Sequence, residues 1–251
     1  MFRIHRAADR GQTNIGWLTS WHSFSFGDYY DPNNMGFRSL RVINDDIIAP
    51  SMGFGTHGHR DMEIVTYLLD GALEHRDSLG NGDVLRPGDV QRMSAGSGIR
   101  HSEFNPADNS QTHLLQIWLE PQQPGGAPSY EQRHFTREER LGCWCPLISS
   151  EKNSAKNSGR KDVGEQNGTA AMPIHADVTV YASILLPGQI LTHSFAPGRH
   201  GYLHLATGRM TTNLSPSGDI LSSGDALRMS NQSSCTITAI TPCEVLLFDL
   251  A

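Results

Sequence analysis

Two short pairs of metal-binding residue types stand at the two ends of one glycine-rich stretch of this sequence. The first pair is His57-Gly-His59 and the second is His101-Ser-Glu103. In a β-strand, side chains at i and i+2 point to the same face, whereas on a helix they point to different faces. If two such strands lie side by side, three imidazoles and one carboxylate converge and leave coordination positions open. That donor set suits a divalent transition metal.

The elements that carry these pairs are predicted to be β-strands. Short runs rich in Val, Ile, Leu and Thr are separated by Gly, Pro, Asn and Asp, at the spacing of a sandwich or small barrel. The best helix candidate is the short polar segment Thr136–Leu141. We therefore predict an all-β fold. The clearest predicted strands are Leu40–Ile43, Glu63–Leu69, Leu114–Leu119, Val178–Leu185, Tyr202–Ala206, Cys235–Ile240 and Glu244–Leu250.

An internal repeat indicates two β domains. The segment Gly88–Ser94 returns as Gly224–Ser230, 136 residues later, with five of its residue types kept in order. The turn Asp70–Leu73 has a counterpart in Thr207–Met210 at nearly the same offset. Two matches at nearly one offset favour a duplication over chance.

The repeat predicts that one copy alone holds a metal. Positions 136 residues after His101 and Glu103 are Ile237 and Ala239, which cannot bind a metal ion. The segment Thr192–Phe195 echoes the first histidine pair but has phenylalanine in place of its second imidazole. We expect the metal, and with it the activity, in the N-terminal half.

Composition excludes several other classes of function. The chain has 251 residues and a formal net charge of −6, which argues against a nucleic-acid-binding surface. No apolar run approaches the roughly 20 residues of a membrane span, and the N-terminal residues lack the apolar core of a signal peptide. Four cysteines are too few and scattered for a disulfide scaffold, and the pair Cys143-Trp-Cys145 is more simply interpreted as ordinary buried thiols than as a metal or redox site. We expect a soluble cytoplasmic protein.

The residues around both ligand pairs, and several further stretches, resemble the pirin family of bicupins. The resemblance covers nearly the whole chain and weakens across Gly142–Met172. It implies two jelly-roll-type cupin β-barrels packed face to face, with a single metal, usually iron, in the N-terminal one. The stretches that carry it are Gly55–Glu63, Met93–Asn105, Ser20–Phe26, Leu40–Asp45 and Glu244–Leu250.

On this basis we expect an N-terminal cupin barrel over 1–135, a connecting segment over 136–175 and a metal-free cupin barrel over 176–251. The N- and C-terminal strands could be exchanged between the barrels. Within the connection, Ser149–Ala171 is polar and almost without apolar residues, so we expect a mobile loop there.

The resemblance implies His57, His59, His101 and Glu103 as the ligands of one divalent metal. Fe²⁺ is the first expectation, and Cu, Ni, Mn and Zn are compatible. Cupins more broadly use the glutamate of the first motif, and Glu63 stands at that position, so two glutamates compete for one role. We expect Glu103 to be the ligand and Glu63 to lie beside the site or in the barrel interior, with either able to act as the catalytic base. Three other histidines without paired partners are expected to be structural or on the surface: His22, His75 and His113.

Two functions are compatible with the resemblance, because some bacterial pirins open the flavonol quercetin with dioxygen and a mammalian one is a nuclear co-regulator. The first hypothesis is a metal-dependent dioxygenase of the quercetinase type, with a flavonol-like aromatic substrate and O₂. The second is a metal-bearing binding protein with a protein partner and no turnover. An enzyme with another natural substrate is a third possibility. We expect a monomer without direct nucleic-acid contact.

Overall fold

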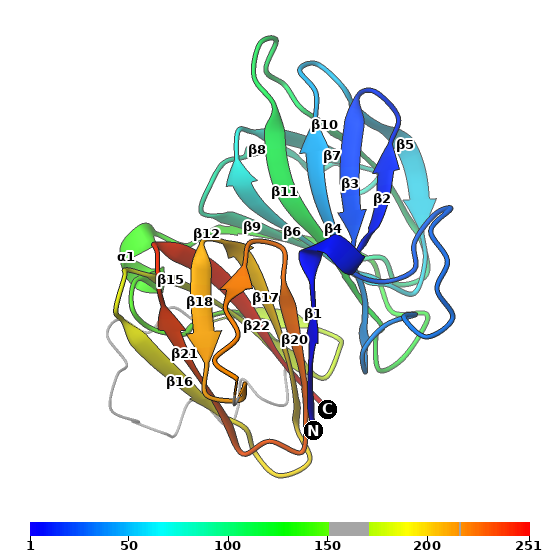
Figure 1. Ribbon diagram of the computed structural model, residues 1–251. Coiled ribbons are helices and arrows are strands. Elements are labelled where there is room, and N and C mark those ends of the chain that lie inside the picture. The colour runs from blue at the N-terminus through cyan, green and yellow to red at the C-terminus, as the bar shows by residue number, and fades with distance from the viewer. Residues whose placement is uncertain (151–170, 216) are drawn as a thin grey trace. The chain divides into compact units, whose positions relative to one another are not determined.

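Strands are almost all of the regular secondary structure in the computed structural model, which describes residues 1–150, 171–215 and 217–251 (Figure 1). The helical elements are a 3-10 turn, η1 (Ala7–Asp9), and one α-helix, α1 (Arg137–Arg140). The Thr136 hydroxyl accepts a hydrogen bond from the Glu139 backbone N–H, and the Glu139 carboxylate accepts one from the Thr136 N–H. This reciprocal cap explains why the short segment is helical, as predicted. Among the described residues, no helix is long and apolar enough to cross a membrane.

The N-terminal unit comprises Arg10–Phe135 and Ile174–Ala176. It contains a seven-stranded sheet, in the order β12-β9-β6-β11-β4-β3-β2, and a four-stranded sheet, in the order β5-β10-β7-β8. Their strands are β2 (Gly11–Asn14), β3 (Leu18–His22), β4 (Leu40–Ile48), β5 (Gly53–His59), β6 (Glu63–Asp70), β7 (Leu73–Asp77), β8 (Gly82–Leu85), β9 (Asp89–Ser94), β10 (Ile99–Phe104), β11 (Thr112–Leu119) and β12 (Ser129–His134).

The C-terminal unit comprises Met1–Asp9, Thr136–Pro173 and Asp177–Ala251. Its two sheets have the orders β1-β20-β17-β22-β15-β13-β14 and β16-β21-β18-β19. Their strands are β1 (Phe2–His5), β13 (Cys145–Ser150), β14 (Met172–Ile174), β15 (Val178–Leu185), β16 (Ile190–Ser194), β17 (His200–Thr207), β18 (Arg209–Thr212), β19 (Leu221–Ser222), β20 (Ala226–Ser230), β21 (Ser234–Ala239) and β22 (Cys243–Leu250).

The predicted mobile loop begins two residues too early. Ser149 and Ser150 are buried and end β13, where Ser149 lies opposite Thr179 of β15 and their hydroxyls are 3.1 Å apart. The rest of the predicted loop, up to residue 170, lies outside the described residues.

The internal repeat has a structural basis in both units. The two four-stranded sheets have the same connectivity. The repeated segments Gly88–Ser94 and Gly224–Ser230 contain β9 in one unit and β20 in the other. The repeated turns place Gly71 and Gly208 at φ of +81° and +88°, and a Cβ at either would collide with a backbone carbonyl of the neighbouring chain segment. Glycine is thus required at both turns by the same conformation and the same close approach.

Clusters of buried apolar side chains draw on both sheets of each unit. In the C-terminal unit, one such cluster includes Leu205, Met210 and Ile237. In the N-terminal unit, two separate clusters lie around Leu73 and around Met93.

Candidate metal centre

The register of β5 against β10 brings the two predicted ligand pairs together. The strands are antiparallel, with His57 opposite His101 and His59 opposite Ile99. Along β10, Ile99, His101 and Glu103 are buried while their neighbours are more exposed, as the period of a strand requires. Strand alternation and cross-strand pairing therefore bring the three predicted imidazoles together.

Three imidazoles form a compact group. One ring nitrogen each of His57, His59 and His101 lies within 4.8 Å of the other two, and Nε2 of His57 is 3.1 Å from Nε2 of His101. The His57 Nδ1 donates to the Gly55 carbonyl oxygen at 2.8 Å. Because a carbonyl can only accept, the proton lies on Nδ1 and the Nε2 lone pair faces His101. A hydrogen bond of this kind orients metal-binding histidines.

Burial favours the neutral form of two of these imidazoles, His59 and His101. It lowers the pKa of His101 to about 2, with the neighbouring histidines adding to the effect, and it lowers the pKa of His59 to about 4 together with His57. Neutral imidazole is the form that binds a metal. The Nδ1 of His101 is also buried without a hydrogen-bond partner in the described part of the chain. These two imidazoles thus have the protonation state, and His101 the unsatisfied nitrogen atom, that a divalent ion would use.

Glu103 is buried, and three side chains hold its carboxylate. Gln116 Nε2 donates to it at 2.8 Å, and Gln91 Nε2 and the Thr66 hydroxyl each donate at 3.3 Å. Burial raises the pKa of Glu103, and the contacts around it partly oppose that rise. The four predicted ligands do not form one group in which every donor atom lies within 4.8 Å of every other. Glu103 belongs instead to a second group, which shares His101 with the first.

The other member of the second group is His75, which was expected to be structural or on the surface. His75 is not on the surface, because it is fully buried in β7 opposite Glu103, with its ring 5.4 Å from that of His101. Its contact with Asp77 is compatible with the expected structural role. His75-Arg-Asp77 has the same i, i+2 spacing as the two predicted ligand pairs, a signal that could have found it. The described donors that meet here are His75, His101 and Glu103.

Glu63 lies apart from both donor groups. It is buried in β6, where its carboxylate accepts from the Ser94 hydroxyl at 2.7 Å and from the His175 backbone N–H at 3.5 Å. Of the two competing glutamates, the structure therefore brings only Glu103 to the imidazoles.

Two other expectations about side chains of this unit agree with the structure. His22 is buried, with its ring nitrogens near Asn44 and Thr13, and His113 pairs with Asp45 at 2.6 Å. Both histidines thus have structural partners.

The cysteine pair contributes to neither group among the described residues. Cys143 and Cys145 are free thiols, and the Cys143 thiol donates to the Glu139 carbonyl oxygen. Burial raises the pKa of Cys143, so the thiolate is disfavoured. These properties fit the interpretation as ordinary thiols.

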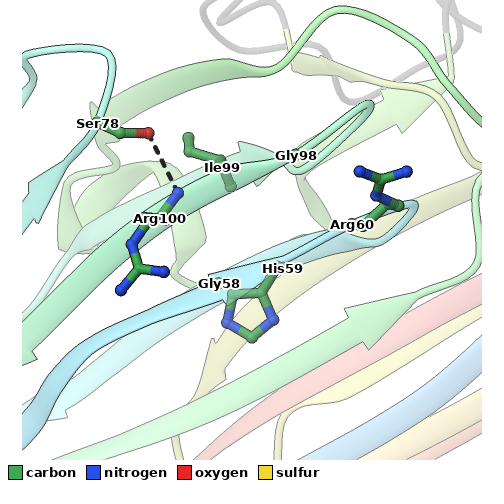
Figure 2. A pocket seen from close by; sticks show the side chains of 7 residues that line it. All are labelled: Gly58, His59, Arg60, Ser78, Gly98, Ile99 and Arg100. Atoms are coloured by element: carbon green, nitrogen blue, oxygen red, sulfur yellow. Dashed lines mark hydrogen bonds between the residues drawn. The ribbon is translucent and has the colours of Figure 1, made fainter.

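A pocket of about 350 Å³ lies at His59 (Figure 2). His59 belongs both to the imidazole group and to the residues that line the pocket. The guanidinium groups of Arg60 and Arg100 have no ion-pair partner among the described residues, and the Arg100 backbone N–H donates to the Ser78 hydroxyl at 3.1 Å. The lining residues are Gly58, His59, Arg60, Ser78, Gly98, Ile99 and Arg100.

Models of two known protein domains match the chain. Residues 2–119 match the model described as Pirin, and residues 163–250 match the one described as Quercetinase C-terminal cupin domain. The chain belongs to the pirin family. Both matched ranges lie in this pirin one after the other along the chain.

Similar proteins cover its full length. It is 41% identical over 250 residues to the "Quercetin 2,3-dioxygenase" of Escherichia coli K12, which covers 100% of this chain and 99% of that protein. It is 42% identical over 241 residues to a "Pirin-like protein" of Caulobacter vibrioides, with 96% of each chain covered. The crystal structure of the bacterial pirin YhhW from E. coli in complex with nickel(II) has a TM-score of 0.86 and 41% identity, and covers 100% of this chain and 99% of that one.

These findings confirm the all-β bicupin fold predicted for this pirin. In each unit the fold is built from two sheets of seven and four strands rather than from one closed barrel. A solved relative binds a divalent transition metal, and the group of three imidazoles described above suits such an ion.

Proposed function

We propose that this pirin is a metal-dependent dioxygenase of the quercetinase type, which opens a flavonol ring with O₂. The observation that carries the proposal is the group of three imidazoles, one of which, His59, also belongs to the residues that line a pocket. The substrate class is supported by the full-length similarity to a protein named quercetin 2,3-dioxygenase.

We propose His57, His59, His101 and Glu103 as the residues that hold one divalent metal. Fe²⁺ is the first candidate, but three nitrogens and one oxygen are also compatible with Cu, Ni, Mn or Zn, and the solved relative contains nickel. When bound, such an ion supplies Lewis acidity, which lowers the pKa of a flavonol hydroxyl that it contacts.

Glu103 is the proposed proton acceptor for that hydroxyl. Its raised pKa makes the carboxylate a better base near neutral pH than an exposed glutamate would be. Gln116, Gln91 and Thr66 fix where its two oxygens lie, so that the base is held in place before substrate binds. Glu63, which is bound to Ser94, is not proposed to share this role.

The pocket is the proposed substrate site. A volume of about 350 Å³ lies at the lower end of the range for small-molecule pockets. Gly58 and Gly98 carry no side chains that would block a flat ring, and Ile99 offers it an apolar contact. The cationic Arg60 and Arg100 side chains would favour the anionic form of a flavonol once its hydroxyl proton has left.

The alternative, a metal-bearing binding protein with a protein partner and no turnover, is the weaker proposal. No feature in the described part of the surface points to such a partner. A monomeric state, a cytoplasmic location and the lack of nucleic-acid contact remain predictions.

The test is a turnover assay on protein loaded separately with iron, copper, nickel and manganese. The flavonol absorption band should fade under air with parallel oxygen uptake, and His59→Ala should abolish the fading. The matched control is His193→Ala, a substitution in the C-terminal unit that should leave turnover in place. A rate no higher than that of free metal with every ion would contradict the dioxygenase and favour the binding protein.

A further inference from the structure

We propose that His75 is a fifth donor of this centre, and that His75, His101 and Glu103 form a second metal position that overlaps the first. The inference rests on the proposed metal site but not on turnover. It concerns a residue outside the four ligands assigned above.

The first support is the register of the four-stranded sheet. Strand β10 lies between β5 and β7, with His101 opposite His57 on one side and Asp77 on the other. The pairing of β10 with β5 has a register shift between His101 and Glu103. The pairing of β10 with β7 is regular at these residues, and there Glu103 lies directly opposite His75. The same buried face of β10 thus meets donors on both neighbouring strands.

The second support is the hydrogen bonding of His75 itself. Its Nε2 lies 3.3 Å from a carboxylate oxygen of Asp77, and both side chains are fully buried. A carboxylate accepts the Nε2 proton, which leaves the lone pair on Nδ1. That Nδ1 is buried and has no hydrogen-bond partner among the described residues. A carboxylate behind a histidine whose other nitrogen is unsatisfied is the usual arrangement of a metal ligand.

The third support is that His75 is fixed in this orientation. Asp77 also accepts from the backbone N–H groups of Leu79 and Asn81 and from the Asn81 side chain, so its carboxylate cannot turn away. The His75 ring stacks on Tyr130, with centroids 4.6 Å apart and planes 17° apart. The imidazole is therefore held before any ligand arrives, as metal donors usually are.

The two donor groups share His101, and an imidazole bound to one ion through one nitrogen serves one metal position at a time, so the two groups hold one ion between them rather than two. His75 places a further nitrogen donor beside Glu103, on the strand that lies on the other side of β10 from His57. When the Glu103 carboxylate is hydrogen-bonded to Gln116 and Gln91 and does not bind the ion, His75 can take its place. The number of protein donors to the ion then stays constant.

The test removes the donors that are unique to the first set. In the double variant His57→Ala/His59→Ala, the metal-free protein should still bind about one equivalent of Co²⁺, at least about tenfold more weakly than the wild type, by calorimetry. Adding His75→Phe, which preserves the aromatic stack on Tyr130, should lower that residual affinity at least tenfold again. Cu²⁺ electron paramagnetic resonance should show coupling to two imidazoles in the double variant and to one in the triple variant.

The matched control is His22→Phe in the same double variant, because His22 is another buried imidazole of this unit with its own partners. It should leave the residual Co²⁺ affinity unchanged. Circular dichroism and thermal unfolding establish that each variant is folded, and His75→Leu replaces His75→Phe if the latter is not.

A double variant that binds no Co²⁺, or residual binding that His75→Phe leaves intact, would overturn the proposal. Loss of flavonol turnover in the wild type would not, since these readouts use the metal alone. The two proposals therefore fail separately.

Discussion

The two four-stranded sheets of this pirin share one connectivity and differ in what their buried faces carry. In β5-β10-β7-β8, the register places polar side chains at five facing positions, whereas the equivalent positions of β16-β21-β18-β19 are almost all apolar. The first set is His57, His101, Glu103, His75 and Asp77, and the second is Leu191, Ile237, Ala239, Met210 and Thr212.

The consequence is visible in the packing of each unit. In the C-terminal unit, Met210, Ile237 and Ala239 join one continuous core cluster. In the N-terminal unit, two separate clusters are present, and buried nitrogens of His75 and His101 lack partners among the described residues. A buried polar atom without a partner costs about 1–3 kcal/mol. The comparison teaches that the strand pairing and the glycine turns define the fold in both units. The residues on the inward faces determine whether a sheet carries metal-binding side chains or an apolar core.

The comparison also corrects one sequence alignment. The segment Thr192–Phe195 was aligned with the first histidine pair so that His193 matched His57. The register instead places His193 opposite Cys235, just as His59 lies opposite Ile99. His193 Nε2 bonds to Asp249 at 2.9 Å, so the one imidazole kept in the second sheet has a structural partner.

The strongest way to break the comparison is to remove histidines from each of the two sheets in turn. His57→Ala combined with His101→Ala should reduce bound metal from about one equivalent per chain to none, and turnover should fall more than about 100-fold because Lewis acidity is lost. His193→Ala should retain the metal. Elemental analysis of protein purified without a His-tag measures both. Two equivalents in the wild type, or metal kept by the double variant, would show that the second sheet or another site binds it.

A second test compares the two sheets by the free energy of unfolding instead of by bound metal. Ile237→Ala should lower the free energy of unfolding by about 2–5 kcal/mol, because Ile237 is fully buried in a continuous core and its removal leaves a cavity. At the equivalent position, His101→Ala should cost about 1 kcal/mol or less in metal-free protein, since an unsatisfied buried nitrogen leaves with the side chain. Urea denaturation in the presence of a chelator compares the two variants. Equal losses would mean that the polar centre contributes to stability as a core does.

A third test sharpens the comparison within the N-terminal unit. Glu103→Gln should weaken metal binding at least about tenfold, whereas Glu63→Gln should change it less than about threefold. Both carboxylates are buried, so a general effect of burial would act on both alike. Calorimetric titration with Ni²⁺ gives the two affinities. The reverse order would place the ligand in the first motif, as in cupins more broadly.

Local patterns were sufficient to predict much of this molecule. Strand β15 has the predicted bounds, Val178–Leu185, because alternating apolar residues end at Pro and Gly. The i, i+2 pairs predicted the three-imidazole group because strand alternation is a local property. The position of His75 opposite Glu103 could not be found in this way. Which strands are neighbours, and where their register shifts, depends on residues far apart in the sequence. His75 was therefore missed although it lies directly opposite Glu103.

The last expected effect is a change in the pH dependence of stability. It concerns Asp46, a buried carboxylate of the N-terminal unit whose counterpart in the C-terminal unit is the uncharged Ser183. Asp46 lies opposite Leu114, two residues before the end of β4, and Ser183 lies opposite Val245 at the same place in β15. Burial raises the pKa of Asp46 to about 7, and the Ser20 hydrogen bond only partly opposes that rise.

Because the folded state binds the Asp46 proton more tightly than the unfolded state, this group's contribution to stability is fully present below the unfolded pKa of about 4 and is lost as pH rises through about 7. Asp46→Asn removes that dependence. Relative to the wild type, the variant should gain roughly 2–3 kcal/mol of stability between pH 5 and pH 8, measured by urea denaturation of metal-free protein at both values. Asp45→Asn is the control, since Asp45 pairs with Arg10 and His113 and its loss should destabilise the protein at pH 8. A pH-independent difference between Asp46→Asn and the wild type would show that Asp46 keeps its charge when buried. The N-terminal unit would then tolerate a buried charge at the position where the C-terminal unit has Ser183.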